Sequence, residues 1–285
     1  MSNKANCGIV WLASYPKSGN TWVRTFLNNL QAVREFGLDV KPHDINRLQN
    51  LTAWDIGAKQ YKKALGKDVS DASDAEIDRA RVVVQQNVVD QNEGILLVKT
   101  HNILAMVNDA PTINMQVTAG VVYIVRNPLD VVISFSAHMN LSIDETIRIM
   151  ATPTFRPRNS GNTVAEIYGS WSENVQSWTK HENQALLVLR YEDLHAEPEK
   201  YFSKLATHLG QGATESETAK AIELSSFKVL KAMEDERGFY EKPKHLKSFF
   251  RSGQTGQWKN QLSDKQIIAV ETLHEPMMKK FGYLP

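Results

Sequence analysis

The sequence contains a single cysteine, Cys7, so neither a disulfide within the chain nor a cysteine-based metal site can form. It also lacks any run of about 18 apolar residues, the length that a membrane-spanning helix needs. The apolar stretch near the N-terminus, residues 9–13, is too short for the core of a signal peptide. These absences predict a cytoplasmic protein without a membrane span.

No excess of charge of one sign is present, because 33 Lys and Arg residues face 32 Asp and Glu residues. A nearly neutral chain has no global field to hold nucleic acid, so we expect no nucleic-acid partner. Any anion must be bound by a local cluster of basic groups. The 285 residues contain no repeat or low-complexity tract, and their length fits one domain, which we predict over residues 1–285.

Four short apolar runs predict buried strands, at residues 9–13, 94–98, 120–125 and 185–189. Helical spacing follows the first strand from Trp22 and recurs at 74–91, 128–139, 164–180 and 197–209. Loops are predicted at 38–72, 140–163 and 232–257. Strands that alternate with helices indicate an α/β fold with a central parallel sheet flanked by helices, which binds ligands at the carboxyl ends of its strands.

The loop after the first strand, YPKSGNTW at residues 15–22, has the composition of a phosphate-binding turn. Free backbone N–H groups and the positive end of a helix dipole attract phosphate, and Lys17 and Thr21 add a charge and a hydroxyl. In a Walker A loop a lysine and the Ser or Thr directly after it open the helix, whereas here Lys17 and Ser18 come before Gly19 and do not open the helix. We therefore expect a phosphate site that needs no metal. The alternative is an ordinary polar turn with a helix cap.

The third strand runs into RNPLDVVIS, residues 126–134. Pro128 suits the first turn of a helix, which places Ser134 about two turns beyond Arg126. The alternative is that Arg126 simply pairs with Asp130 on the surface.

Near the C-terminus, FFRSGQTGQWK at residues 249–259 forms a basic, glycine-containing segment. The basic residues of this region are Lys242, Lys244, Lys247, Arg251 and Lys259. The guanidinium of Arg251 and the accessible backbone at Gly253 are suited to closing over a phosphate. A solvated basic face is the alternative.

His101 follows the second strand in the segment VKTH. A neutral imidazole, whose usual pKa is about 6.5, accepts a proton at neutral pH and so suits general-base catalysis. A lone histidine at a strand end is more often a structural residue, and that alternative stays open here.

Together these segments resemble the PAPS-dependent sulfotransferases, where PAPS is 3′-phosphoadenosine 5′-phosphosulfate. YPKSGNTW resembles the 5′-phosphosulfate loop, RNPLDVVIS the RNPxDxxxS segment that holds the 3′-phosphate, and FFRSGQTGQWK the RKGxxGDWK loop. KTH and RYEDL, residues 190–194, also occur in the family, and all lie in the family's order. Two positions depart from the pattern: Ser252 replaces a lysine and Gln257 an aspartate, so one charge contact to the 3′-phosphate is either missing or supplied by Lys247 or Lys259.

The resemblance implies a P-loop-like, nucleotide kinase-like sulfotransferase fold and in-line transfer of a sulfuryl group from PAPS to a hydroxyl or amine, which releases PAP, the 3′,5′-bisphosphate. It implies that His101 is the general base, that Lys17 stabilises the leaving oxygen and that Lys99 assists at the sulfuryl oxygens, without a metal. The implied nucleotide-binding residues are Pro16, Lys17, Ser18, Gly19, Asn20, Thr21, Trp22, Arg126, Ser134, Tyr191, Phe227, Arg251, Ser252 and Gly253, of which Trp22, Tyr191 and Phe227 would frame the adenine.

Two other functions remain possible from sequence alone, a P-loop kinase and a catalytically silent nucleotide-binding module. The expected acceptor is a small molecule such as a phenol, alcohol, glycolipid or glycopeptide. Apolar side chains predicted to wall its pocket are Met106, Met139, Phe155, Phe239 and Tyr240. The family's dimer segment, KxxxTVxxxE, is not matched after Lys259, so the oligomeric state stays open.

Overall fold

The computed structural model describes residues 7–159 and 161–284. Outside this range lie residues 1–6, which belong to the N-terminal segment used for the signal-peptide prediction, residue 160 of the predicted loop 140–163, and residue 285. The predicted single domain of residues 1–285 includes these positions, so its ends are not described.

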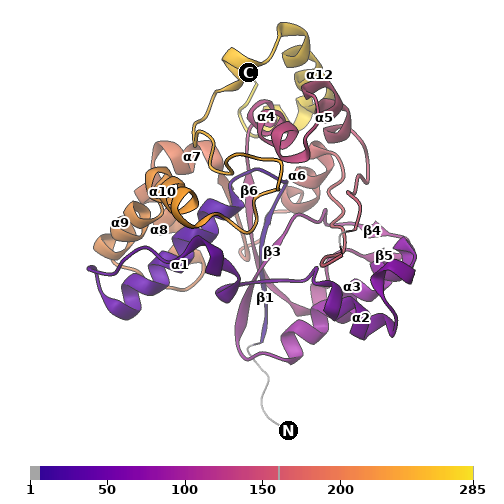
Figure 1. Cartoon of the computed structure of the whole chain (residues 1–285), viewed down its shortest axis with the longest axis horizontal. Coiled ribbons are helices and arrows are strands. Elements are labelled where there is room, and N and C mark those ends of the chain that lie inside the picture. Colours follow the sequence, from indigo (N-terminus) through magenta and orange to yellow (C-terminus); the bar gives the residue numbers. More distant parts are fainter. Residues whose placement is uncertain (1–6, 160, 285) are drawn as a thin grey trace.

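A five-stranded parallel sheet forms the centre of the molecule, in the order β2-β3-β1-β6-β7 (Figure 1). Its strands are β1 (Gly8–Ser14), β2 (Thr52–Trp54), β3 (Ile95–Thr100), β6 (Thr118–Val125) and β7 (Leu186–Arg190). A small antiparallel pair, β4 (Met106–Val107) and β5 (Ala110–Pro111), lies apart from it. The parallel pairing confirms the predicted α/β class and all four predicted strands.

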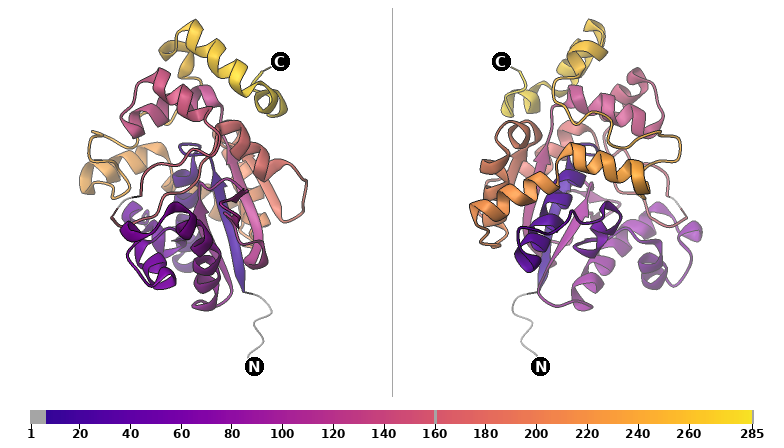
Figure 2. Two further views of the ribbon diagram at one scale, coloured as in Figure 1. Left: turned by 90° about the vertical axis from the view of Figure 1, so that its right-hand side faces the viewer. Right: turned by 60° about the vertical axis from the view of Figure 1, so that its left-hand side comes forward.

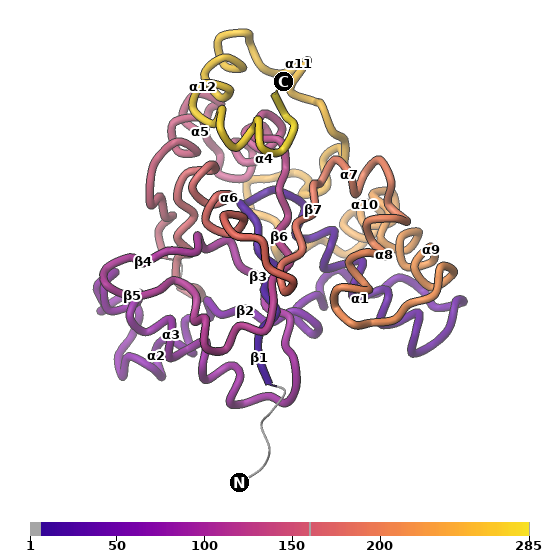
Figure 3. The backbone as a smooth tube through the Cα atoms, turned by 180° about the vertical axis from the view of Figure 1, so that it is seen from behind, coloured from indigo at the N-terminus to yellow at the C-terminus, as the bar shows by residue number. Residues whose placement is uncertain are grey.

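Helices cover both faces of the sheet. The α-helices of the described residues are α1 (Asn20–Phe36), α2 (Ala58–Leu65), α3 (Asp74–Asp90), α4 (Pro128–Met139), α5 (Ile143–Met150), α6 (Trp171–Thr179), α7 (Tyr191–Ala196), α8 (Pro198–His208), α9 (Glu215–Leu224), α10 (Phe227–Arg237), α11 (Trp258–Gln261) and α12 (Asp264–Lys280). Figure 2 shows α8, α9 and α10 on the same side as α1, and Figure 3 shows α12 above α4 and α5, which it contacts. The predicted helices 74–91, 128–139 and 197–209 are confirmed to within a residue or so at either end.

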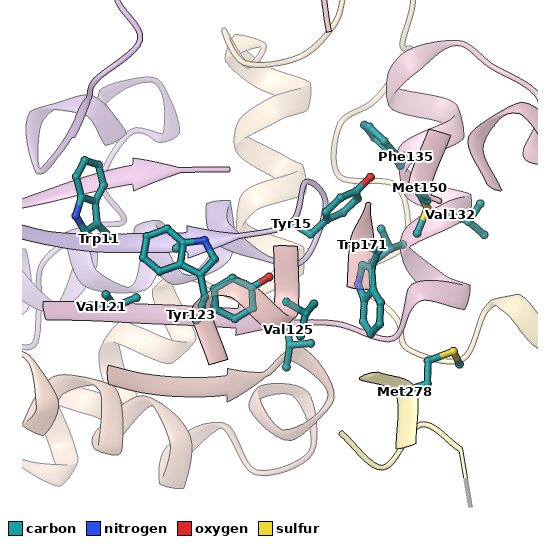
Figure 4. Close-up of a cluster of buried hydrophobic side chains, with 14 of the residues drawn as sticks. Trp11, Tyr15, Val121, Tyr123, Val125, Val132, Phe135, Met150, Trp171 and Met278 are labelled. Atoms are coloured by element: carbon teal, nitrogen blue, oxygen red, sulfur yellow. The ribbon is translucent and has the colours of Figure 1, made fainter. Parts of the chain in front are cut away.

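The core follows from the alternation of side chains along the buried strands. Trp11 of β1 and Tyr123 of β6 face a cluster that includes Trp171 and Trp178 of α6 (Figure 4). Leu12 and the neighbouring β6 positions face the other way, into a cluster with α1 and α8. Both faces of the sheet are therefore buried, which is why the strand sequences are apolar throughout rather than alternating.

Two predictions about local structure are wrong. The helix predicted at 164–180 begins only at Trp171, because Ser170 and Glu173 form a capping box and Gly169 has a φ of 65°. The segment before it is extended and pairs with the chain after β3: the N–H of Ile103 donates to the carbonyl of Ile167 at 2.7 Å. The predicted loops also contain regular structure, with β2 and α2 inside 38–72, α5 inside 140–163 and the end of α10 inside 232–257.

The sheet brings distant parts of the sequence to one edge. The parallel strands β1, β3 and β6 lie side by side, so the residues that follow them meet at their carboxyl ends. The loop after α10, drawn in orange in Figure 1, crosses this edge and is bonded to α4 through Asp130, which accepts from the N–H groups of Gly256 (2.7 Å) and Trp258 (3.2 Å).

Candidate active site

The loop between β1 and α1 is held in an unusual backbone conformation. Gly19 has a φ of 107°, and a Cβ atom there would lie 2.6 Å from the ring of Tyr191. Lys17 also has a positive φ, 68°. The Asn20 side chain donates to the carbonyl of Leu12 at 2.8 Å, which ties the start of α1 to β1. The loop thus requires glycine at one position and is fixed at both ends.

Fifteen of the sixteen predicted site residues line one cavity of about 570 Å³, a volume typical of ligand sites. They are Pro16, Lys17, Gly19, Asn20, Thr21, Trp22, Lys99, His101, Arg126, Ser134, Tyr191, Phe227, Arg251, Ser252 and Gly253. Ser18 is buried and does not line the cavity. The structure therefore brings three distant segments of the chain to one site, as the predicted binding of one nucleotide requires.

Arg126 does not form the surface ion pair that was the alternative interpretation. Its guanidinium donates to the carbonyls of Lys17 (3.1 Å) and Gln254 (3.2 Å) and lies 4.2 Å from the centre of the Tyr191 ring. Asp130 is buried and accepts from the C-terminal loop instead. Arg126 is thus a bridge between the first loop and the last.

The segment that carries Arg251 is anchored by a buried carboxylate. Glu234 of α10 accepts from the backbone N–H groups of Phe249 (2.5 Å) and Phe250 (3.0 Å). The Arg251 guanidinium donates to the carbonyl of Ile133 in α4 at 3.1 Å. These bonds fix a basic side chain at the cavity from a segment without regular structure.

Lys17 lies in a strongly positive environment. Burial, together with the nearby charges of Arg251 and Arg126, lowers the pKa of its ammonium to about 7. Its Nζ atom sits 4.0 Å from the centre of the Phe249 ring. Three cations that destabilise one another in the protein alone are stabilised by an anion with more than one charge, such as a nucleotide phosphate.

His101 is oriented by the end of β1. Its Nδ1 atom lies 2.7 Å from the carbonyl oxygen of Ser14, so this nitrogen carries the proton and donates. Nε2 is then left as the acceptor. Burial and the charge of Lys99 lower the pKa of His101 to about 3, so the ring is neutral at neutral pH.

Lys99 lines the same cavity but is not a free cation. Its Nζ atom lies 3.2 Å from a carboxylate oxygen of Glu166, a residue that is only 5% exposed. The sequence interpretation did not find Glu166, because the segment that contains it was assigned to a helix. Lys99 is therefore oriented by a partner that no motif indicated.

The three aromatic residues predicted to frame the adenine lie around one end of the cavity. The rings of Trp22 and Tyr191 meet edge to face with centres 5.7 Å apart, and both line the cavity together with Phe227. Gly253 lies against Phe227: a Cβ atom at residue 253 would lie 2.3 Å from that ring.

Replacing Gly253 by alanine should weaken the binding of PAP about 10-fold or more, since the added methyl group displaces the Phe227 ring from the cavity. Gly256 provides a matched control. It also has a positive φ, 74° against 62°, but nothing lies within 4 Å of an added Cβ. Both alanine variants carry a similar backbone cost of about 1 kcal/mol, so calorimetric titration with PAP separates the ring contact from strain. Equal affinities of the two variants would contradict this expectation.

None of the five side chains predicted to wall the acceptor pocket lines this cavity, so that prediction is wrong; Met139 and Phe155 pack against the core instead. Met106 and Tyr240 are exposed, at 65% and 83%, while Phe239 is buried behind Phe249 and Phe250. The apolar and aromatic side chains that do line this part of the cavity are Trp54, Ile56, Ile133, Tyr168, Phe249 and Phe250, and His138 lies among them. Most of them come from the regions predicted as loops or from the misassigned segment, so no helical or strand pattern pointed to them.

Neither Lys247 nor Lys259, the residues predicted to replace the charge missing at Ser252, is among the residues that line the cavity. Arg126 and Arg251 line it together with Ser252, whereas Lys259 lies 5.7 Å from the centre of the Trp258 ring. Among residues 7–159 and 161–284, no group of three or more His, Cys, Asp or Glu side chains could hold a metal ion. No helix within these residues has the length and apolar character needed to cross a bilayer.

A parallel α/β sheet brings the loop after β1, the start of α4 and the loop before α11 to one cavity beside a neutral histidine, an arrangement suited to a nucleotide-dependent group-transfer enzyme. Residues 9–282 match the family model of the sulfotransferase domain. Two curated relatives are similar to this chain. Flavonol 3-sulfotransferase of Flaveria bidentis is 27% identical over 98% of this chain and 84% of its own length. The 3-alpha-hydroxysteroid sulfotransferase of Cavia porcellus is 31% identical over 59% of this chain and 58% of its own length.

The fold is also that of solved proteins. A crystal structure of mouse sulfotransferase SULT7A1 complexed with PAP has a TM-score of 0.62 at 20% identity and covers 97% of this chain and 87% of its own. Retinol dehydratase in a complex with retinol and PAP has a TM-score of 0.63 at 19% identity, with 96% and 82% covered. The chain belongs to the sulfotransferase domain family. It is a PAPS-dependent sulfotransferase, which confirms the family, fold and activity that the motifs predicted.

Proposed function

We propose that this chain transfers the sulfuryl group of PAPS in line onto a hydroxyl of a small, flat, apolar acceptor, with His101 as general base. The observation that carries the proposal is the convergence of Lys17, Arg126 and Arg251 on one cavity that His101 also lines. The two phosphate groups of one nucleotide would be bound by these three cations, Lys17 from the first loop and Arg126 and Arg251 from the other two segments.

The residues fit the nucleotide in other respects. Two polar atoms, Arg126 Nε and Ser18 Oγ, are buried without a hydrogen-bond partner among the described residues. Arg126 lines the cavity, so a bound nucleotide could supply the partner of its Nε atom. Gly19 and Gly253 each lie where a Cβ would strike an aromatic ring. PAPS supplies the activated sulfuryl group, and the chain supplies position and charge. Lys17 would bind the 5′-phosphate and offset charge on the leaving oxygen, whereas Arg126, Ser134 and Arg251 would bind the 3′-phosphate.

The acceptor proton would pass to Nε2 of His101, since Nδ1 already donates to Ser14. The aromatic walls of Trp54, Tyr168 and Phe249 favour a planar or polycyclic acceptor such as a phenol or alcohol. Relatives named for flavonols and hydroxysteroids support this class. Glycolipids, glycopeptides and amines are less well matched by these walls.

The single-domain and cytoplasmic predictions are kept as part of the proposal. One family model spans residues 9–282 without interruption, which supports one domain. Relatives from Arabidopsis thaliana named cytosolic sulfotransferases support the location.

The proposed function is tested by PAPS turnover against a panel of phenols, sterols and flavonols, with PAP, ADP and ATP titrated in parallel. We expect turnover with at least one acceptor, and PAP binding at least about 10-fold tighter than ADP because the 3′-phosphate meets charged groups. Preference for ATP would indicate a kinase. PAP binding without turnover of any acceptor would indicate a catalytically silent module.

A further inference from the structure

Glu166 connects two residues of the cavity without lining the cavity itself. One carboxylate oxygen lies 3.2 Å from Nζ of Lys99, and the other accepts the backbone N–H of His101 at 2.5 Å. The side chain is 5% exposed and is absent from the cavity wall. Lys99 and His101 are two residues apart at the end of β3, so a single carboxylate spans both.

The position of Glu166 is fixed by the backbone around it. Ile167, its neighbour, accepts from the N–H of Ile103 at 2.7 Å and donates to the side chain of Asn102 at 2.8 Å. The extended segment before α6 is thus bonded directly to the chain that follows β3. These bonds hold the backbone beside Glu166 in place, so that its side chain starts from a fixed position next to Lys99 and His101.

The charge of Glu166 opposes that of the cations around His101. Burial would raise the pKa of the Glu166 carboxyl, but the charge of Lys99 and the hydrogen bond from the His101 backbone N–H help to outweigh it, so the pKa lies below its usual value and the group is ionised. Lys99 and Lys17 lower the pKa of His101, whereas Glu166 and the Ser14 carbonyl raise it. His138 is a further titratable group of this region and is neutral at pH 7, because burial lowers its pKa to about 3.

This balance matters when His101 takes a proton. The imidazolium that forms would stand beside the ammonium of Lys99, and Glu166 is the anion in contact with both residues. A neutral residue at 166 would leave two positive groups adjacent in a poorly solvated place, where their repulsion is strong.

We propose that Glu166 is a positioning residue for sulfuryl transfer, which holds Lys99 and His101 in a fixed relation and offsets the positive charge that His101 gains. It acts through these two residues and touches neither donor nor acceptor. The proposal rests on the function proposed above, in which His101 is the base.

The test compares Glu166→Gln, Glu166→Asp and a control, Asp55→Asn, in the full chain with PAPS and an acceptor that the wild type uses. Asp55 is a second buried carboxylate of the same region, whose pKa is raised to about 6 by burial and by Glu166. It accepts from Gln85 at 2.8 Å and does not line the cavity.

We expect kcat to fall about 10- to 100-fold in Glu166→Gln, because the variant should lose part of the contribution of the general base. The Kd for PAP should stay within about twofold of the wild type, because the interaction acts mainly in the transition state. Glu166→Asp keeps the charge but is one methylene shorter, and should recover part of the loss. Asp55→Asn should turn over like the wild type.

Unchanged kcat in Glu166→Gln, in a protein that loses turnover on removal of His101, would overturn the inference and leave the proposed function intact. An equal loss in Asp55→Asn, or loss of PAP binding along with kcat, would also overturn it, because the role would then be one of general stability. A wild type that turns over no acceptor would overturn both.

Discussion

Replacing His101 by alanine is expected to lower kcat by about 10²- to 10⁴-fold, the usual contribution of a general base. The reason is geometric: Nδ1–H donates a hydrogen bond to the Ser14 carbonyl, which leaves Nε2 free to accept a proton, and the ring is neutral at neutral pH. Steady-state turnover of PAPS with a saturating acceptor measures the loss.

Binding of PAP to the His101→Ala variant should stay within about twofold of the wild type, because the ring is not expected to contact either phosphate. His181, an exposed histidine, is the matched control, and its replacement by alanine should leave turnover unchanged. If the variant at His101 retained wild-type kcat, another group would have to be the base, and the neutral His138 in the cavity wall would be examined next.

Replacing Lys17 by methionine is expected to lower kcat about 10²- to 10³-fold, the loss typical of removing one group that stabilises a developing anion. PAP affinity should also fall, since one of three converging cations is gone. The stability of the fold should not decrease, because burial and the charges of Arg251 and Arg126 disfavour the charged form of Lys17 and lower its pKa to about 7.

The sign of the stability effect follows from that lowered pKa. A lysine whose folded pKa lies below its unfolded value destabilises the protein at pH values below the folded pKa, and less so as the pH rises above it. The Lys17→Met variant should therefore have a Tm equal to or above that of the wild type at pH 6, while its kcat is strongly reduced. A lower Tm with unchanged kcat would contradict the assigned role.

The sequence predicted those parts of the fold that depend on local pattern. Strands β1, β3, β6 and β7 are apolar runs buried on both faces, and α4 begins with the Asn127 cap and Pro128. The edge strand β2 was missed, because three residues in a polar region carry no periodicity. The segment before α6 was taken for helix because Val164 and Ile167 have helical spacing, whereas its conformation is fixed by bonds to the chain after β3.

The candidate site likewise contains residues that the sequence predicted and residues that it did not. Residues such as Lys17 and Arg126 follow directly from strands, so the carboxyl edge of a parallel sheet collects them and their proximity could be predicted. Trp54, Tyr168 and Glu166 come from segments whose course depends on tertiary packing, and no spacing in the sequence indicates them. Asn20 was assigned to the nucleotide, yet its side-chain amide is used to anchor α1 to β1.

The most direct test of the account is a crystal structure of the protein with PAP bound. We expect the 5′-phosphate at the loop of Lys17 and Thr21, the 3′-phosphate between Arg126 and Arg251, and the adenine among the aromatic rings near Gly253. A nucleotide bound elsewhere, or with its 3′-phosphate away from both arginines, would contradict the claim that three separate segments form one nucleotide site beside His101.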